Sequence, residues 1–170
     1  ELGVYCEIHP YRLPAEAIRR FAPRAVILSG GPASVDAPGA PRCAPEVFAL
    51  GVPVLGICYG LQLLAAQLGG RVAPSDRREY GAAEIEVLEP VGLLAPFRPG
   101  ERVPVWMNHG DRVEELPPGF RALARTEGSP CAAVADPERG LYGVQFHPEV
   151  VHSPRGREML HAFLFQTCGL

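Results

Sequence analysis

Hydrophobic positions in the first part of the chain form short apolar runs separated by helical patterns. Residues 25–28 and 53–57 are wholly apolar, which is typical of parallel strands that are buried on both faces. Residues 59–68 carry apolar side chains at helical spacing, and two glycines that can end a helix follow them. The same pattern predicts a strand at residues 4–8 and helices at residues 14–21 and 45–50.

The second part of the chain predicts mainly strands. Residues 84–87 alternate between polar and apolar side chains, as a half-exposed strand does. Further strands are predicted at residues 102–107, 120–125, 131–135 and 141–146. A last helix is predicted at residues 154–167, with Leu160, Phe163, Leu164 and Thr167 on its inner face. This order predicts an α/β fold with a mostly parallel central sheet, flanking helices and an antiparallel extension.

Composition narrows the classes of function. The chain has 170 residues, which is enough for one domain with a sizeable core, and no internal linker divides residues 1–170. A net charge of −3 provides no basic field for nucleic acid, and no apolar run is long enough to cross a bilayer. Five scattered cysteines without a C-x-x-C pair argue against disulfides and a metal site, and they favour a cytoplasmic location.

The segment Gly-Ile-Cys-Tyr-Gly at residues 56–60 follows a predicted buried strand and opens a predicted helix. A strand, a sharp turn with flanking glycines and a helix form the nucleophile-elbow pattern, here with cysteine in place of serine. The start of a helix also favours a thiolate. Cys58 is therefore the candidate nucleophile; the alternative is a buried structural cysteine at the end of a strand.

His147 and Glu149 follow the predicted strand at 141–146 and are separated by a proline. The proline favours an extended conformation, in which alternate side chains point to the same side of the chain. His147 could then act as general base for Cys58, and Glu149 could orient its imidazole. If His147 is considered without the other motifs, an ordinary histidine in a surface loop is the more common interpretation.

Ser29, Gly30, Gly31 and Pro32 follow the predicted strand at 25–28. Their backbone N–H groups could form an oxyanion hole in which the Gly31 N–H pairs with that of Tyr59. A phosphate-binding loop is an alternative, but an alanine stands where the related S-G-G-x-D-S loop has its aspartate. A simple turn is the remaining alternative. Nucleophile, base and oxyanion donors together match a site for acyl transfer.

Five blocks of sequence resemble class I glutamine amidotransferases, most closely the branch formed by the amidotransferase domains of GMP synthases. They are I-L-S-G-G-P-A-S-V, G-V-P-V-L-G-I-C-Y-G-L-Q, R-E-Y-G, V-W-M-N-H-G-D and Y-G-V-Q-F-H-P-E-V. The cysteine and histidine blocks mark the class, and the R-E-Y-G and N-H-G-D blocks point to the branch. The resemblance implies a flavodoxin-like fold and hydrolysis of L-glutamine to glutamate and ammonia through a cysteine thioester.

The resemblance also implies residue roles. Cys58, His147 and Glu149 would form the catalytic triad, and Gly31 and Tyr59 the oxyanion hole. The α-amino and carboxylate groups of glutamine would be held by Gly30, Pro32, Gln62, Gly110 and Asp111. The alternatives are purely structural roles: Gln62 could lie on a helix surface, and Asp111 could form a turn.

Partners and cofactors follow from the same resemblance. No cofactor or metal is expected in this domain; ATP and magnesium are expected on a partner ATP-pyrophosphatase (synthetase) domain or subunit, which aminates XMP to GMP. The full enzyme would be a homodimer through a region outside residues 1–170. The family has a further strand and most of a helix before the point that corresponds to residue 1. A stand-alone γ-glutamyl hydrolase, an amidotransferase subunit for another acceptor and a non-catalytic module are the alternatives.

Overall fold

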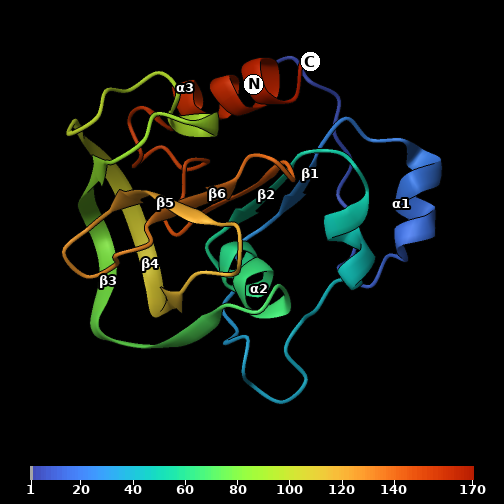
Figure 1. Ribbon diagram of the computed structural model, residues 1–170, viewed down its shortest axis with the longest axis horizontal. Helices are drawn as coiled ribbons and strands as arrows, with labels where there is room; N and C mark the ends of the chain where they lie inside the picture. Colours follow the sequence, from blue (N-terminus) through green and yellow to red (C-terminus); the bar gives the residue numbers. More distant parts are fainter. Residues whose placement is uncertain (1) are drawn as a thin grey trace.

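A computed structural model describes residues 2–170, which form one seven-stranded sheet in the order β1-β2-β7-β6-β5-β3-β4 (Figure 1). β1 (Val26–Leu28), β2 (Val54–Ile57) and β7 (Leu141–Val144) pair in parallel. The other pairs are antiparallel. They involve β6 (Ala133–Asp136), β5 (Arg121–Arg125), β3 (Arg71–Val87) and β4 (Arg102–Glu115). The expected α/β class with an antiparallel extension is confirmed, and the antiparallel part is the longer one.

Helices cover both faces of the sheet (Figure 1). α2 (Tyr59–Gln67) buries Leu61 and Leu63 on one face, whereas α3 (Gly156–His161) continues into η3 (Ala162–Thr167) on the other. Successive side chains along the strands point alternately into the hydrophobic cores on the two faces of the sheet, because side chains of a strand alternate between its faces. The remaining helices are α1 (Ala15–Phe21), η1 (Pro45–Ala49) and η2 (Gly92–Leu94).

Most predicted elements lie where the pattern put them, but β3 and β4 extend well beyond their predicted ends. β3 begins at Arg71, and its pairing with β4 shifts register between Pro74 and Glu79. The irregular, polar stretch between those residues hides the strand from a search for alternation. In the last helix, Met159 is fully buried although it lies outside the predicted inner face.

The predicted strand at residues 4–8 is wrong. No strand is present between residues 2 and 14, and the side chains of Tyr5 and Ile8 are 78% and 97% exposed. A strand needs a hydrogen-bonded neighbour, and none lies beside this segment among the described residues. β1 is also less buried than its apolar sequence predicts, and the side chain of Ile27 is 46% exposed. The reason is that β1 lies at the edge of the described sheet.

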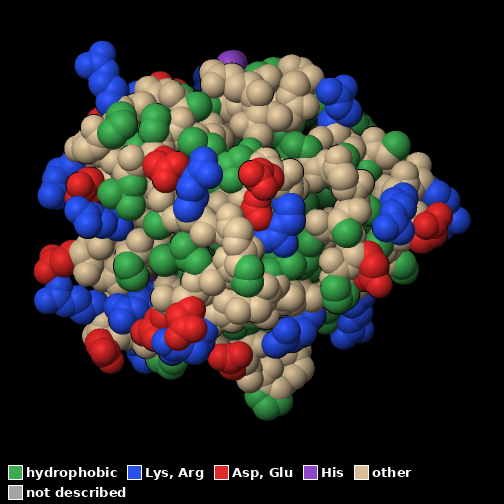
Figure 2. Space-filling view, viewed as in Figure 1, with side chains coloured by type: hydrophobic (Ala, Val, Ile, Leu, Met, Phe, Trp, Pro, Cys, Tyr) green, Lys and Arg blue, Asp and Glu red, His purple; other side chains and the backbone are tan. Residues whose placement is uncertain are grey.

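The surface carries charges of both signs in close succession. Figure 2 shows arginines interspersed with aspartates and glutamates on one face. Ion pairs such as Arg71–Glu114 at 2.8 Å and Arg125–Glu86 at 3.0 Å link neighbouring strands. No helix in the described part of the chain is long and apolar enough to span a membrane.

Candidate active site

Cys58 occupies a strained turn between β2 and α2. Its backbone has φ 52° and ψ −106°, a positive-φ conformation that non-glycine residues rarely adopt. The turn is held in place by a 2.7 Å hydrogen bond from the Cys58 N–H to the Val144 carbonyl of β7. A strained nucleophile between a strand and a helix is the geometry of a nucleophile elbow.

The two glycines that flank Cys58 are required by close contacts rather than by unusual backbone angles. A Cβ atom at Gly56 would lie 2.5 Å from the Gly60 backbone, and one at Gly60 would lie 2.1 Å from the Leu28 carbonyl oxygen. Backbone atoms cannot move aside as a flexible side chain can. Glycine at both positions therefore lets β1, β2 and α2 approach one another closely.

His147 and Glu149 lie just beyond the end of β7, the strand next to β2. Nδ1 of His147 is 2.7 Å from Oε1 of Glu149, a distance that fits a short charge-assisted hydrogen bond. The backbone of His147 is fixed by its N–H, which donates to the Trp106 carbonyl, and by Ser153, whose hydroxyl donates to the His147 carbonyl. The imidazole therefore has a defined orientation.

His147 and Cys58 are neighbours without a direct hydrogen bond between their side chains. Gly30 packs behind both, since a Cβ atom there would lie 3.1 Å from Cε1 of His147 and 3.5 Å from Cβ of Cys58. Nε2 of His147 is buried and has no hydrogen-bond partner within residues 2–170. Interaction with the Cys58 sulfur, and then the hydrogen bond with Glu149, raise the pKa of His147 to about 10. Such pairs often tighten only when substrate is bound.

Gly31 and Tyr59 bring two backbone N–H groups to this region. Tyr59 begins α2, so its N–H lies in the first turn and has no acceptor within the helix. The Gly31 N–H donates to no protein acceptor in the described part of the chain. A Cβ atom at Gly31 would lie 3.8 Å from the Tyr59 ring, and the Tyr59 hydroxyl donates away from the site to the Pro41 carbonyl. Only the backbone of Tyr59 is thus available to a ligand.

A pocket of about 640 Å³ opens over Cys58 and His147. Five of its lining residues are Gly30, Gly31, Pro32, Gly110 and Asp111. The others besides Cys58 and His147 are Ala33, Ser34, Gln62, Arg78, Tyr80, Asn108 and His109. The structure thus brings eight of the ten candidate residues to one cavity, with Glu149 behind His147 and Tyr59 at the base of α2.

Gln62 is more constrained than its predicted role suggests. It is 4% exposed, and its Nε2 donates to the Asp111 carbonyl at 2.9 Å and to Oε1 of Gln145 at 3.3 Å. Both N–H groups of its amide are therefore engaged within the protein. The amide oxygen is the part of Gln62 that remains to accept a hydrogen bond from a ligand.

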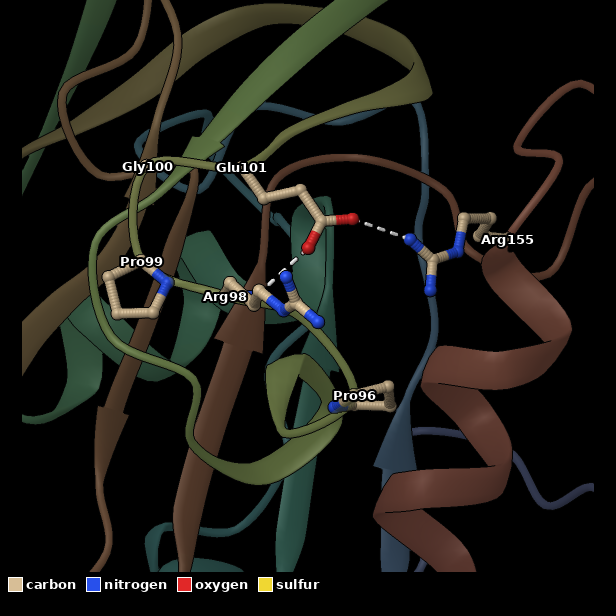
Figure 3. A pocket seen from close by; sticks show the side chains of 6 residues that line it. All are labelled: Pro96, Arg98, Pro99, Gly100, Glu101 and Arg155. Carbon is tan, nitrogen blue, oxygen red and sulfur yellow. Dashed lines mark hydrogen bonds and ion pairs between the residues drawn. The ribbon is translucent and has the colours of Figure 1, made fainter.

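A second pocket of about 550 Å³ contains none of the candidate residues (Figure 3). Glu101 points to Arg155 across it, with a 2.7 Å ion pair, and its other carboxylate oxygen accepts the Arg98 N–H at 2.9 Å. Arg155 also bonds Glu158 and stacks on Phe97. These charged groups are paired with one another, and the candidate residues line only the pocket over Cys58.

Several lining residues had no assigned role in the sequence. Arg78 and Tyr80 belong to R-E-Y-G, and Asn108 and His109 belong to N-H-G-D. Both blocks marked the resemblance, and Glu79 pairs with His109 across β3 and β4. The sequence therefore contained both motifs, but only the pairing of β3 with β4 shows that they lie side by side. No group of three or more potential metal-ligating side chains occurs among residues 2–170.

Comparisons with known proteins identify the family of the chain. The family model for glutamine amidotransferase class-I matches residues 1–167. GMP synthase [glutamine-hydrolyzing] of Nostoc sp. (strain PCC 7120) is 52% identical over 99% of this chain and 31% of its own length. The Natranaerobius thermophilus protein of that name is 49% identical over 100% of this chain and 33% of its own. The chain spans about a third of the length of these relatives.

Solved structures agree with the fold. A Thermoplasma acidophilum protein assigned as a GMP synthase subunit has a TM-score of 0.81 at 26% identity, covering 99% of this chain and 83% of its own. A glutamine amidotransferase from Thermotoga maritima has a TM-score of 0.72 at 21% identity, covering 86% and 79%, and supports the fold alone. With an elbow cysteine, a histidine–glutamate pair and a family model over almost its whole length, the chain belongs to the class I glutamine amidotransferases.

Proposed function

We propose that the chain hydrolyses the side-chain amide of L-glutamine with Cys58 as nucleophile, His147 as general base and Glu149 as the group that orients it. The observation that carries the proposal is that a strained cysteine and a histidine bonded to a glutamate lie at adjacent strand ends, with Cys58 and His147 lining one pocket. This arrangement suits acyl transfer.

The reaction would proceed in two halves. The Cys58 thiolate attacks the amide carbon, and the oxyanion that forms is held by the N–H groups of Gly31 and Tyr59. His147 gives its proton to the departing nitrogen, which leaves as ammonia, and a thioester remains. Water then gives a proton to His147 as it attacks the thioester, which releases glutamate and restores the thiolate. Each step uses only residues of this chain.

Charges in the pocket favour an amino acid as substrate. Arg78 supplies a guanidinium that suits an α-carboxylate, whereas Asp111 supplies a carboxylate that suits an α-ammonium group. The free amide oxygen of Gln62 adds an acceptor for that ammonium. Gly30, Pro32 and Gly110 would shape the walls against which the amino-acid end lies.

The ammonia would be used by an ATP-dependent synthetase domain or subunit outside residues 1–170. The names of the relatives and the third of their length that this chain spans support this proposal. ATP and magnesium would bind that partner, XMP would be the acceptor, and the whole enzyme would be a cytoplasmic homodimer. A stand-alone γ-glutamyl hydrolase and a subunit for another acceptor are the competing assignments.

Glutamate release under four conditions tests the proposal. The conditions are the chain alone, with the synthetase partner, with ATP and XMP, and with partner and nucleotides together. We expect low activity alone and the highest activity with both, because only then is the ammonia acceptor present. Full activity of the chain alone, unchanged in the other three conditions, would favour the stand-alone hydrolase.

We also propose that one further strand pairs with the free edge of β1. Among the described residues β1 pairs only with β2, and Ile27 is 46% exposed although the run around it is apolar. An open edge leaves backbone groups without partners. Hydrogen exchange at Val26–Leu28 in the full-length protein tests this: we expect protection, and rapid exchange at the outward-facing amides would contradict it.

A further inference from the structure

The side-chain amide of Gln145 lies directly against the nucleophile. Ile57 pairs with Val144 in adjacent strands, so Cys58 and Gln145 leave the sheet side by side. Gln145 is fully buried, and its Nε2 is 3.7 Å from Sγ of Cys58. A buried amide that lacked partners would be costly, and the sulfur accepts one of its N–H groups.

The direction of this hydrogen bond is fixed by the next amide. Gln62 donates to the Asp111 carbonyl, which can only accept, so its NH₂ group must face Asp111. Its second N–H then meets Oε1 of Gln145 at 3.3 Å. If the side-chain amide of Gln145 were flipped by 180°, its NH₂ group would face the NH₂ group of Gln62. Its N–H groups must therefore point towards Cys58.

The Asp111 carbonyl, which accepts from Gln62, extends this series of hydrogen bonds to β3. It also accepts from Nδ1 of His109 at 2.9 Å, and Nε2 of His109 is 3.0 Å from Oε2 of Glu79. Burial would raise the pKa of Glu79, but hydrogen bonds from His109 and Thr126 hold it below its usual value. The Asp111 carbonyl and the Glu79 carboxylate are both acceptors, so the ring N–H can donate to either of them, according to the tautomer. The contact between His109 and Glu79 thus ends this series of hydrogen bonds on β3.

We propose that Gln145 is a further catalytic residue, whose amide N–H stabilises the Cys58 thiolate. The hydrogen bonds from Gln62 back to the His109–Glu79 pair keep that N–H in place. This inference rests on the proposed function, because it matters only if Cys58 reacts as a thiolate. It assigns to the glutamine of the Q-F-H-P-E block a chemical task separate from those of the triad.

The surroundings of the sulfur explain why such a donor is needed. In the thiol form, Sγ donates to the Asn108 carbonyl at 3.6 Å. When the proton leaves, that carbonyl dipole opposes the charge, and hydrogen bonds to a thiolate must offset it. The other titratable or charged groups that face the site are His147, Glu149, Arg78, Tyr80, His109 and Asp111. A substitution at residue 145 leaves the chemical identity of all these groups unchanged.

The test is the pH dependence of Cys58 alkylation by iodoacetamide in the full-length protein. Gln145→Met removes the donor at similar size, and Gln145→Glu keeps an acceptor for Gln62 but places a carboxylate beside the sulfur. We expect the midpoint of the pH–rate curve to move up by about one pH unit in the first variant and further in the second. Turnover of glutamine should fall about tenfold or more, with KM changed less than kcat.

Gln67→Met is the matched control. Gln67 is the last residue of α2. Like Gln145 it pairs its side-chain amide with a cysteine, because it donates to the Cys43 carbonyl at 3.1 Å and accepts from the Cys43 thiol at 3.6 Å, but it is outside the pocket. Its substitution should leave the Cys58 alkylation curve unchanged. Unchanged curves in both Gln145 variants, or an equal shift in the Gln67 control, would overturn the assignment.

A measurement on the unsubstituted protein removes any dependence on how the variants fold. With ¹⁵N-labelled glutamine side chains, the NH₂ signal of Gln145 should move as Cys58 ionises, and the signal of Gln67 should not. A Gln145 signal that ignores this ionisation would refute the inference. Alkylation needs no glutamine hydrolysis, so the chain could fail to hydrolyse glutamine and still show the shift, and the two hypotheses are tested separately.

Discussion

Replacing Gly60 with alanine tests whether the close contact between α2 and β1 maintains the oxyanion donors. The new Cβ atom would lie 2.1 Å from the Leu28 carbonyl oxygen and 2.8 Å from the carbonyl carbon. Both atoms belong to the backbone, so the contact can be relieved only if β1 and α2 separate. The loop that contains Gly31 follows β1 directly, whereas Tyr59 begins α2. Separation therefore pulls the two N–H groups apart.

The size of the effect follows from the overlap. Ordinary contact at this position needs an opening of about 1 Å, and a misplacement of about 1 Å can cost ~10²-fold in rate. Loss of one oxyanion donor costs about 10²–10³-fold in turnover. We therefore expect kcat to fall about 10²-fold with a smaller change in KM. The overpacking itself should cost about 1–3 kcal/mol of stability, or roughly 2–12 °C in Tm.

Glutamate release at saturating glutamine measures the loss, and thermal unfolding measures the strain. Gly70→Ala is the control, because its Cβ atom would lie 2.6 Å from the Glu115 carbonyl oxygen at the opposite end of α2. That variant should lose similar stability and keep its turnover. If Gly60→Ala retained kcat within about twofold, or if both variants lost turnover equally, the link between this contact and the oxyanion site would be wrong.

Three further predictions concern the triad and the pocket. A glutamine-like alkylating agent should label Cys58 before exposed Cys6, and peptide mapping that finds Cys6 labelled first would contradict the assignment. Asp111→Ala should weaken glutamine use but spare use of added ammonia by the full-length protein, and unchanged glutamine kinetics would remove Asp111 from the pocket. Because the pKa of His147 is raised in the folded protein, protonated His147 stabilises the fold. This contribution is complete below pH 6.5 and is lost progressively as pH rises through about 10. The difference in unfolding free energy between wild type and Glu149→Gln should therefore be largest near pH 6 and shrink towards pH 10, and a flat difference across that range would refute it.

Local sequence predicted the elbow because its causes are local. The apolar run of β2, the two glycines and the start of α2 are all contiguous with Cys58, and each leaves a pattern in the sequence. His147 and Glu149 were found for the same reason, because Pro148 and the end of β7 are adjacent to them. Their meeting with Cys58 depends on the order of strands in the sheet, which the spacing of the motifs along the chain does not give.

Features set by distant partners escaped the sequence. The segment at residues 4–8 has the composition of a strand but no neighbour to pair with, and β3 continues through an irregular polar stretch because β4 lies beside it. The task of Gln145 was hidden in the same way. Its pattern is that of any polar residue at the end of a strand, and only its contacts with Cys58 and Gln62 give it a chemical meaning.

The position of β7 has a consequence for how the protein acquires its reactivity during synthesis. β7 follows every other strand in the chain but lies inside the sheet, between β2 and β6. The cysteine elbow therefore leaves the ribosome long before the strand that supports its turn and orients its base. Contacts between such distant segments form late, since a long loop must close first. A nascent or partly folded chain thus carries the Cys58 thiol without the histidine proposed as its base, and the proposed site is assembled only when the sheet is complete.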